Sequence, residues 1–136
     1  RHTALTPESP QAKWTAALWP LVREMIKTAI ENGQNLVVEG CYIPYGFAED
    51  FSAEQLRHIR PLWLVFSQQY LAHHFDNILR HEAAIEMRRT SPAFLAETLA
   101  AASREDLEAC TRYGLPYVLI DGTYTVDASV LDAYLP

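Results

Sequence analysis

The sequence is short of several features that would place it in a special class of protein. It has only two cysteines in 136 residues, Cys41 and Cys110. Their number and spacing fit neither a disulfide framework nor a zinc site, so we expect two free thiols. No apolar run approaches the length that spans a bilayer, and the first residues show no secretory signal. The sequence therefore predicts a cytoplasmic protein without a membrane partner.

Basic residues are also scarce. Eleven lysines and arginines stand against seventeen aspartates and glutamates, which gives a net charge of −6. This balance argues against nucleic acid as the main partner. A chain that is 49% hydrophobic and 21% charged has an ordinary globular composition. Because no linker, repeat or low-complexity segment interrupts it, we predict a single domain over residues 1–136.

Signals for helices and strands alternate along the chain. Ser or Asp residues placed as N-caps, followed by apolar stripes, indicate helices. These helices are predicted at residues 9–33, from 52, at 67–89, at 91–113 and at 127–135. Pro20 predicts a kink or a split in the first of them. Short apolar runs between turn residues predict strands at 35–40, 62–66 and 117–121.

The order of these elements predicts an α/β fold. Each predicted strand is apolar along its whole length, which indicates parallel pairing with helices on both faces of the sheet. We therefore expect a three-layer architecture built on a parallel sheet. In open parallel sheets, ligands bind at the carboxyl ends of the strands.

Candidate site residues stand at the predicted carboxyl ends of the strands. They are Glu39 with Gly40, Ser67, and residues 121–123 (Asp-Gly-Thr). A carboxylate followed by Gly, which lets a ligand approach the backbone, suits a metal-bound water or a general base for a hydroxyl acceptor. A purely structural role for an acid at a strand end is the alternative.

Three arginines stand in the second half of the predicted helix at 67–89. Arg80 and Arg88 differ by about two helical turns, so they share nearly one face and could reach a polyphosphate together with Arg89. The alternative is a solvated helix face on which Glu82 and Glu86 pair with these arginines.

Histidines and tyrosines offer two further interpretations. His73 and His74 are adjacent, so they point about 100° apart on a helix and do not predict a zinc site. Tyr42 and Tyr45 follow the strand predicted to end at Glu39, and could wall a substrate pocket or pack against the sheet.

The succession of segments resembles the adenylate-kinase-like P-loop small-molecule kinases. NLVVEG at 35–40 resembles the strand ahead of their acceptor-binding loop, and HFDNILRHEAAIEMRR at 74–89 resembles their helical lid. YVLIDGT at 117–123 resembles the last strand, which leads to the adenine-contacting loop. The resemblance covers most of the chain, and it implies a P-loop NTPase-like fold with a lid insertion over about residues 73–95.

The resemblance also implies roles and cofactors. The expected activity is transfer of the γ-phosphoryl group of ATP to a small-molecule hydroxyl or phosphate acceptor, with Mg²⁺. Glu39 would act near magnesium through water, and the three arginines would be lid residues. The acceptor would meet Gly40, Tyr42 and Tyr45, and the nucleotide would meet Asp121, Thr123 and Tyr124.

One family signature does not occur in the chain. No G-x-x-x-x-G-K-[ST] motif is present, and the five glycines do not cluster. The resemblance therefore implies that the first strand and the phosphate loop of the fold are missing and that the chain is an inactive fragment. The strands at 35–40 and 61–67 would then have open edges, which predict a homo-oligomer. The alternatives are a non-catalytic binding or regulatory module completed by a partner chain, and an unrelated α/β domain without a phosphate site.

Overall fold

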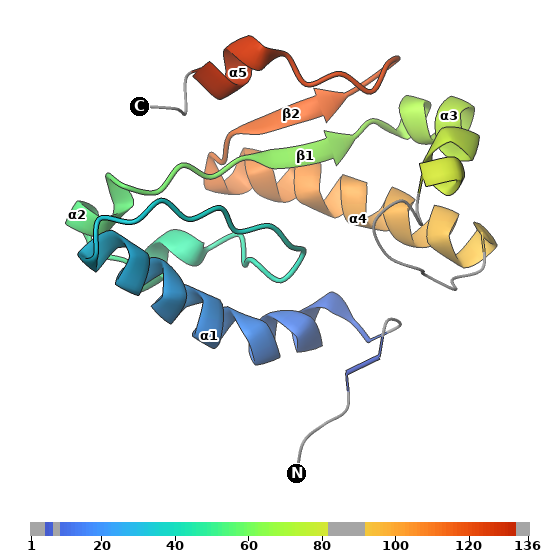
Figure 1. The fold of residues 1–136 in the computed structure, drawn as a ribbon. Coiled ribbons are helices and arrows are strands. Elements are labelled where there is room, and N and C mark those ends of the chain that lie inside the picture. The colour runs from blue at the N-terminus through green and yellow to red at the C-terminus, as the bar shows by residue number, and fades with distance from the viewer. Residues whose placement is uncertain (1–4, 7–8, 82–91, 133–136) are drawn as a thin grey trace. The chain divides into compact units, whose positions relative to one another are not determined.

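The computed structural model describes residues 5–6, 9–81 and 92–132 (Figure 1). Its contacts gather in two compact units, Arg1–Arg60 and Pro61–Pro136. Each unit is described by itself below, and the single domain stays a prediction. Within the described ranges, no helix combines the length and the apolar character needed to cross a membrane.

The first unit begins with a long helix. Helix α1 (Gln11–Glu31) is continuous through Pro20, so the predicted split does not occur. Asn32 is its C-cap, and Gly33 follows with a φ of 62°, a left-handed conformation that glycine adopts without steric cost. The sequence placed this end correctly.

Two short helices and three aromatic rings complete the first unit. The 3-10 helix η1 (Phe47–Asp50) precedes α2 (Ala53–Leu56), and the predicted capping box between Ser52 and Gln55 is present at α2. Trp19, Phe47 and Phe51 are buried. The Trp19 and Phe51 rings meet edge to face with centroids 6.1 Å apart, a favourable aromatic geometry. This cluster anchors α1 to the segment around η1.

The predicted strand at 35–40 is wrong. Residues 34–40 form no strand and contain no turn or bend. The Gln34 amide donates to the Ala29 carbonyl oxygen and the Glu39 carbonyl oxygen accepts from the Tyr42 hydroxyl, and the one sheet of the described residues does not include this segment. Val37 is 93% exposed and Leu36 is 44% exposed. The run has the composition of a buried strand, but a strand also needs a neighbour to pair with its backbone.

The second unit contains the strands. In chain order its elements are β1 (Trp63–Phe66), α3 (Gln68–His81), α4 (Pro92–Tyr113), β2 (Tyr117–Ile120) and α5 (Ala128–Asp132). Strands β1 and β2 pair in parallel, with Trp63 opposite Tyr117 and Phe66 opposite Ile120. Both strands and their parallel direction agree with the sequence.

The predicted three-layer parallel sheet is wrong. The described part of the chain contains one sheet of two four-residue strands, and its regular structure is mostly helical. The expected P-loop NTPase-like architecture needs a wider parallel sheet, which two paired strands do not make. Because the segment at 35–40 stays unpaired, the sheet gains no third member from it.

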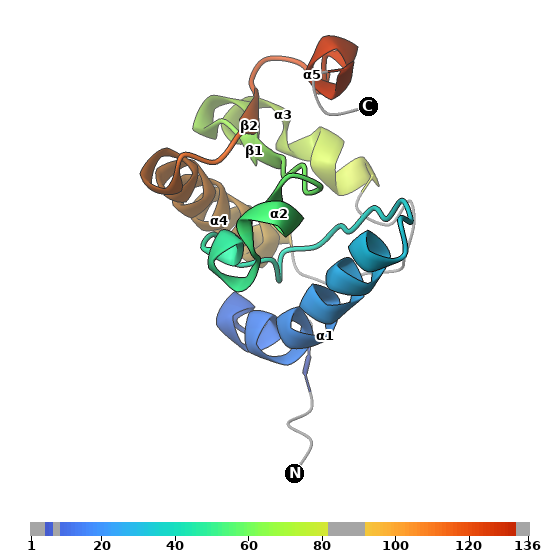
Figure 2. The ribbon, with the colours of Figure 1, turned by 90° about the vertical axis from the view of Figure 1, so that its left-hand side faces the viewer.

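Helix α4 covers the strand pair, and buried side chains from α4, β1 and β2 form the core of the second unit. The helix packs along β1, and α5 lies on the opposite side of the pair (Figures 1 and 2). Val65, Cys110 and Ile120 are each 1% exposed. Gly114 ends α4 with a φ of 63°, as the sequence predicted.

Helix α3 differs from its prediction. It begins after Ser67 as expected, but it is kinked at His74, where φ is −125° and ψ is 16°. It ends at His81 in the structure, and the predicted continuation to 89 lies outside the described residues, as does much of the predicted lid at 73–95.

At the other end of the unit, Asp127 caps α5 by accepting a 2.9 Å hydrogen bond from the Ser129 amide.

Candidate functional site

The carboxyl ends of β1 and β2 bring two polar side chains together. Ser67 follows β1 and Asp121 follows β2, and parallel pairing places both at one edge of the sheet. The Ser67 hydroxyl donates a 2.5 Å hydrogen bond to Oδ1 of Asp121. The same hydroxyl oxygen accepts a 2.9 Å hydrogen bond from the Tyr70 amide, so it also caps α3. The predicted strand-end residues of this unit therefore meet.

The loop after β2 exposes further polar groups. Gly122 has a φ of 79°, which turns the chain sharply at the strand end. The hydroxyls of Thr123 and Thr125 lie 3.1 Å apart and share a hydrogen bond. Tyr124 is 60% exposed, and its ring centroid lies 6.0 Å from that of Phe66. Three hydroxyl groups and one carboxylate thus cluster on an exposed turn.

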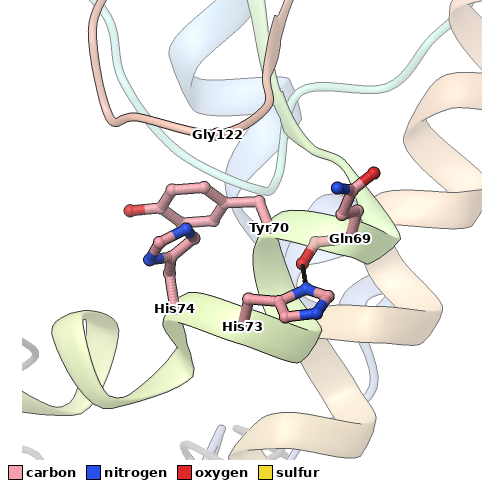
Figure 3. Close-up of a pocket in the computed structure, with 5 residues that line it drawn as sticks. All are labelled: Gln69, Tyr70, His73, His74 and Gly122. Carbon is pink, nitrogen blue, oxygen red and sulfur yellow. Dashed lines mark hydrogen bonds between the residues drawn. The ribbon is translucent and has the colours of Figure 1, made fainter.

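A small cavity lies beside this turn. It is lined by Gln69, Tyr70, His73, His74 and Gly122, and its volume is about 80 Å³ (Figure 3). The Tyr70 and His74 rings lie side by side with centroids 5.0 Å apart, and the Gly122 turn passes over them (Figure 3). Nδ1 of His73 lies 2.9 Å from the Gln69 carbonyl oxygen. The space suits a few waters or one small group, since ligand pockets usually enclose several hundred Å³.

His73, His74 and Gly122 were named in the sequence analysis for other reasons, whereas Gln69, Tyr70 and the cavity that they line were missed. Tyr70 is 3% exposed, and its ring stacks on that of Phe66 with centroids 5.4 Å apart. This packing holds the Tyr70 ring in place as one wall of the cavity. A signal for it was available. Because Ser67 ends a strand and caps the next helix, the first turns of that helix must lie beside the strand end.

The predicted arginines do not gather in the described part of the chain. Arg80 is exposed near the end of α3, beyond the kink at His74. Arg88 and Arg89 lie outside the described residues. Whether the three share a face stays a prediction.

The remaining predicted site residues belong to the first unit. Glu39 and Gly40 are exposed, and Tyr42 and Tyr45 are half-buried. The Tyr42 hydroxyl donates a 2.8 Å hydrogen bond to the Glu39 carbonyl oxygen. A Cβ on Gly40 would overlap the Tyr42 ring. Glu39, Gly40 and Tyr42 therefore form one local turn, with the Glu39 carboxylate on its surface.

The oxygen donors of the second unit fit magnesium and sugar hydroxyls better than they fit phosphate. Mg²⁺ takes one or two carboxylates and fills its other positions with water and substrate oxygens. Asp121 with Ser67 can supply such oxygens. Among the residues that the structure describes, no cluster of three His, Cys, Asp or Glu side chains forms a metal site made by protein alone. No glycine-rich motif with Lys is present to neutralise a triphosphate.

Comparison with known proteins adds no relative. The chain matches no protein-family model, and searches of curated proteins and of solved structures return no match. Membership of the kinase family, magnesium binding and nucleotide binding therefore stay predictions.

Proposed function

We propose that this chain takes part in ATP-dependent phosphoryl transfer to a small-molecule hydroxyl or phosphate acceptor. The observation that carries the proposal is the hydrogen bond between Ser67 and Asp121 at the carboxyl ends of two adjacent parallel strands. That edge is where parallel sheets bind nucleotides and other ligands. A carboxylate, a hydroxyl and a positive-φ glycine at such an edge support a ligand with hydroxyl groups and a bound cation.

Each polar group on the edge has a role in this proposal. Asp121 and Ser67 supply oxygens to magnesium or to the ribose. Thr123 donates or accepts a hydrogen bond with the nucleoside, and the exposed ring of Tyr124 offers a face for base stacking. The cavity bordered by Tyr70 and His74 is too small for a nucleotide, so the nucleotide lies on the exposed turn above it.

Residues of the first unit and of α3 have roles on the acceptor side. Glu39 takes the proton of the acceptor hydroxyl or acts on magnesium through water, with Gly40, Tyr42 and Tyr45 around the acceptor. Arg80, Arg88 and Arg89 neutralise the transferred phosphoryl group. The exposed carboxylate of Glu39 and the exposed side chain of Arg80 leave both groups accessible.

A second candidate function is favoured by one feature of the sequence. The 136 residues contain no glycine-rich loop with Lys, the part of a P-loop kinase that holds the phosphates. A binding or regulatory module that holds a nucleoside without transferring phosphate fits the same strand-end groups. The two functions differ in whether the phosphates add affinity.

Calorimetric titration of the purified chain separates the two functions. Mg-ATP, adenosine and inorganic triphosphate are titrated separately. The kinase proposal expects a Kd for Mg-ATP below about 1 mM and at least about tenfold tighter than for adenosine, because the proposed magnesium and the arginines at 80, 88 and 89 would bind the phosphates. The module expects equal affinities for Mg-ATP and adenosine.

Two matched variants connect binding with the site. Asp121→Asn removes the charge but keeps an oxygen for the Ser67 hydroxyl, and we expect it to weaken Mg-ATP binding at least about tenfold. Asp132→Asn removes another exposed charge, from α5, and should leave the affinity unchanged. Absence of binding by all three ligands, or equal losses in the two variants, contradicts both functions at this site.

A further inference from the structure

The cavity beside the turn after β2 is lined by groups that carry no negative charge. The described residues around it are Gln69, Tyr70, His73, His74 and Gly122. Each of the four side chains holds a group that can donate a hydrogen bond, and an imidazole that takes up a proton becomes a cation. Gly122 adds only backbone. The lining therefore favours a ligand that accepts hydrogen bonds and carries negative charge.

The hydroxyl of Tyr70 lacks a partner. Tyr70 is 3% exposed, and its ring contacts those of Phe66 and His74 with centroid distances of 5.4 Å and 5.0 Å. Its hydroxyl has no hydrogen-bond partner among the residues that the structure describes. A side-chain oxygen that is fully enclosed without a partner is costly, and the described residues contain none. The hydroxyl oxygen therefore borders open space, which is the cavity that Tyr70 lines.

His74 presents its ring at the same point. Figure 3 shows the Tyr70 hydroxyl at the outer end of its ring, next to the His74 imidazole and under the Gly122 turn. Neither nitrogen of the His74 ring is hydrogen-bonded to a described residue. His73 differs, because its Nδ1 is engaged with the Gln69 carbonyl oxygen at 2.9 Å. A phenol and an imidazole, both without partners in the described part of the chain, thus meet at one side of the cavity.

We propose that this cavity binds one phosphate group, either as free phosphate or as the end of a small phosphate monoester. The Tyr70 hydroxyl donates a hydrogen bond to one phosphate oxygen, and the His74 ring donates to another. A volume of about 80 Å³ accepts a single phosphate group and excludes a nucleotide. The site uses none of the strand-end groups assigned to magnesium and nucleotide, and it does not depend on the phosphotransferase function.

Two properties of phosphate fit this lining better than those of other small anions. Its oxygens are arranged as a tetrahedron, so donors can reach it from several sides, whereas the oxygens of a carboxylate lie in one plane. Near neutral pH, phosphate also keeps a proton on part of its molecules. That hydroxyl can donate to a neutral imidazole nitrogen, which sulfate cannot do because it carries no proton. We therefore expect selectivity for phosphate over sulfate, which has the same shape.

One carboxylate stands next to the lining. Asp121 precedes Gly122, and its Oδ1 accepts the 2.5 Å hydrogen bond from Ser67. Its negative charge opposes an anion in the cavity, so loss of that charge should strengthen phosphate binding. The nucleotide proposal makes the opposite prediction, because Asp121 would help to hold magnesium there. The two proposals can therefore fail independently.

Nuclear magnetic resonance titration of the whole isotope-labelled chain tests the site. Inorganic phosphate, sulfate and acetate are added separately at constant ionic strength and neutral pH, without magnesium. We expect the amide signals of His74 and Gly122 to shift with phosphate and to saturate with a Kd below about 5 mM, at least about fivefold tighter than for sulfate or acetate. Glycerol 3-phosphate identifies the source of the group, because tighter binding than phosphate assigns the site to a monoester and weaker binding assigns it to the free anion.

Matched variants connect the binding with the two side chains. Tyr70→Phe removes the hydroxyl and keeps the ring stack, and His74→Phe removes the ring nitrogens and keeps an aromatic ring. Each should weaken phosphate binding at least about fivefold with an unchanged circular dichroism spectrum. Tyr117→Phe, which removes the hydroxyl of a 42% exposed tyrosine on β2, is the control and should bind phosphate as the unchanged chain does.

The same titrations can overturn the proposal. A phosphate affinity no higher than that for sulfate, signals of His74 and Gly122 that do not move, or full binding by the folded Tyr70→Phe chain would each do so. Asp121→Asn should bind phosphate at least as tightly as the unchanged chain. Loss of phosphate binding in that variant would also contradict the site, because the anion would then depend on a group that should repel it.

Discussion

The hydroxyl of Ser67 joins two chain segments that lie 54 residues apart, because it donates a 2.5 Å hydrogen bond to Oδ1 of Asp121. It also accepts a hydrogen bond from the Tyr70 amide at the start of α3. One atom thus ends a strand, begins a helix and holds the loop after the second strand. The helix N-terminus also favours the negative charge of Asp121 beside it.

Removal of this hydroxyl should cost more than removal of an ordinary helix cap. We expect Ser67→Ala to lower the free energy of unfolding by about 1–2 kcal/mol, because the α3 cap and the bond to Asp121 are both lost. Chemical denaturation measures it, and a double-mutant cycle with Asp121→Ala should show coupling. Ser52→Ala, at the capping box of α2, is the matched control and should show no coupling to Asp121. Additive losses at residues 67 and 121 would contradict the expectation.

The indole of Trp19 depends on Asp50. Its Nε1 donates a 2.7 Å hydrogen bond to Oδ2 of Asp50, and Trp19 is 7% exposed. Asp50→Ala leaves this donor without its partner, so we expect a loss of about 1–3 kcal/mol in stability and a shift in tryptophan fluorescence. Glu49→Ala, at the exposed neighbouring position, should change stability by less than about 0.5 kcal/mol. Equal effects of the two changes would show that the hydrogen bond is unimportant.

Gly40 and Tyr42 should behave as a pair. Alanine at position 40 would place its Cβ inside the Tyr42 ring, which is held by the hydrogen bond to Glu39. We expect Gly40→Ala to cost about 1–3 kcal/mol by displacing the ring. In a Tyr42→Ala background the same change should cost less, as thermal unfolding can measure, while the φ of 156° at Gly40 still strains an alanine there. If Gly40→Ala costs the same stability with and without the Tyr42 ring, the contact between the two residues is contradicted.

The two cysteines should differ in reactivity. Burial raises the pKa of the Cys110 thiol, with a smaller contribution from Asp106, while Cys41 is exposed. With Cys41→Ser as the reference, the remaining thiol should react with Ellman's reagent at least about a hundredfold more slowly than it does in denaturant. Equal rates would place Cys110 on the surface.

The raised pKa of Cys110 also fixes the sign of a pH effect. The folded chain holds the thiol proton more tightly than the unfolded chain, so this stabilisation is present below the ordinary thiol pKa of 9.0. It is lost as the pH rises through the higher pKa of the folded state. Denaturation curves measured from pH 8 upward should show a fall in stability that is smaller in Cys110→Ala.

Local chemistry made parts of the fold predictable. Ser52 with Gln55, Ser67 and Gly114 act on the residues beside them, so helix starts and ends could be placed from the sequence alone. Strands β1 and β2 were also found, since each is a short apolar run between turn residues. Their parallel pairing brought Ser67 and Asp121 together, as strand-end residues should be.

What failed depended on distant partners. Val37 and Val38 favour a strand, but a strand forms only where a second backbone lies beside it, and composition does not show whether one does. The wider sheet was inferred from that same segment, so the fold class failed with it. The kink at His74 was missed because no proline or glycine announces it.

The kink at His74 has a consequence for any projection of α3 onto a helical wheel. A wheel assumes a constant step of about 100° per residue, and the backbone angles at His74 interrupt that step. Two wheels are needed, one that carries the buried Tyr70 and Leu71 and one that carries the half-buried Ile78 and Leu79. The direction of Arg80 relative to Tyr70 is therefore set by the torsion angles of a single residue, and straightening that residue would rotate Arg80 about the axis of the helix.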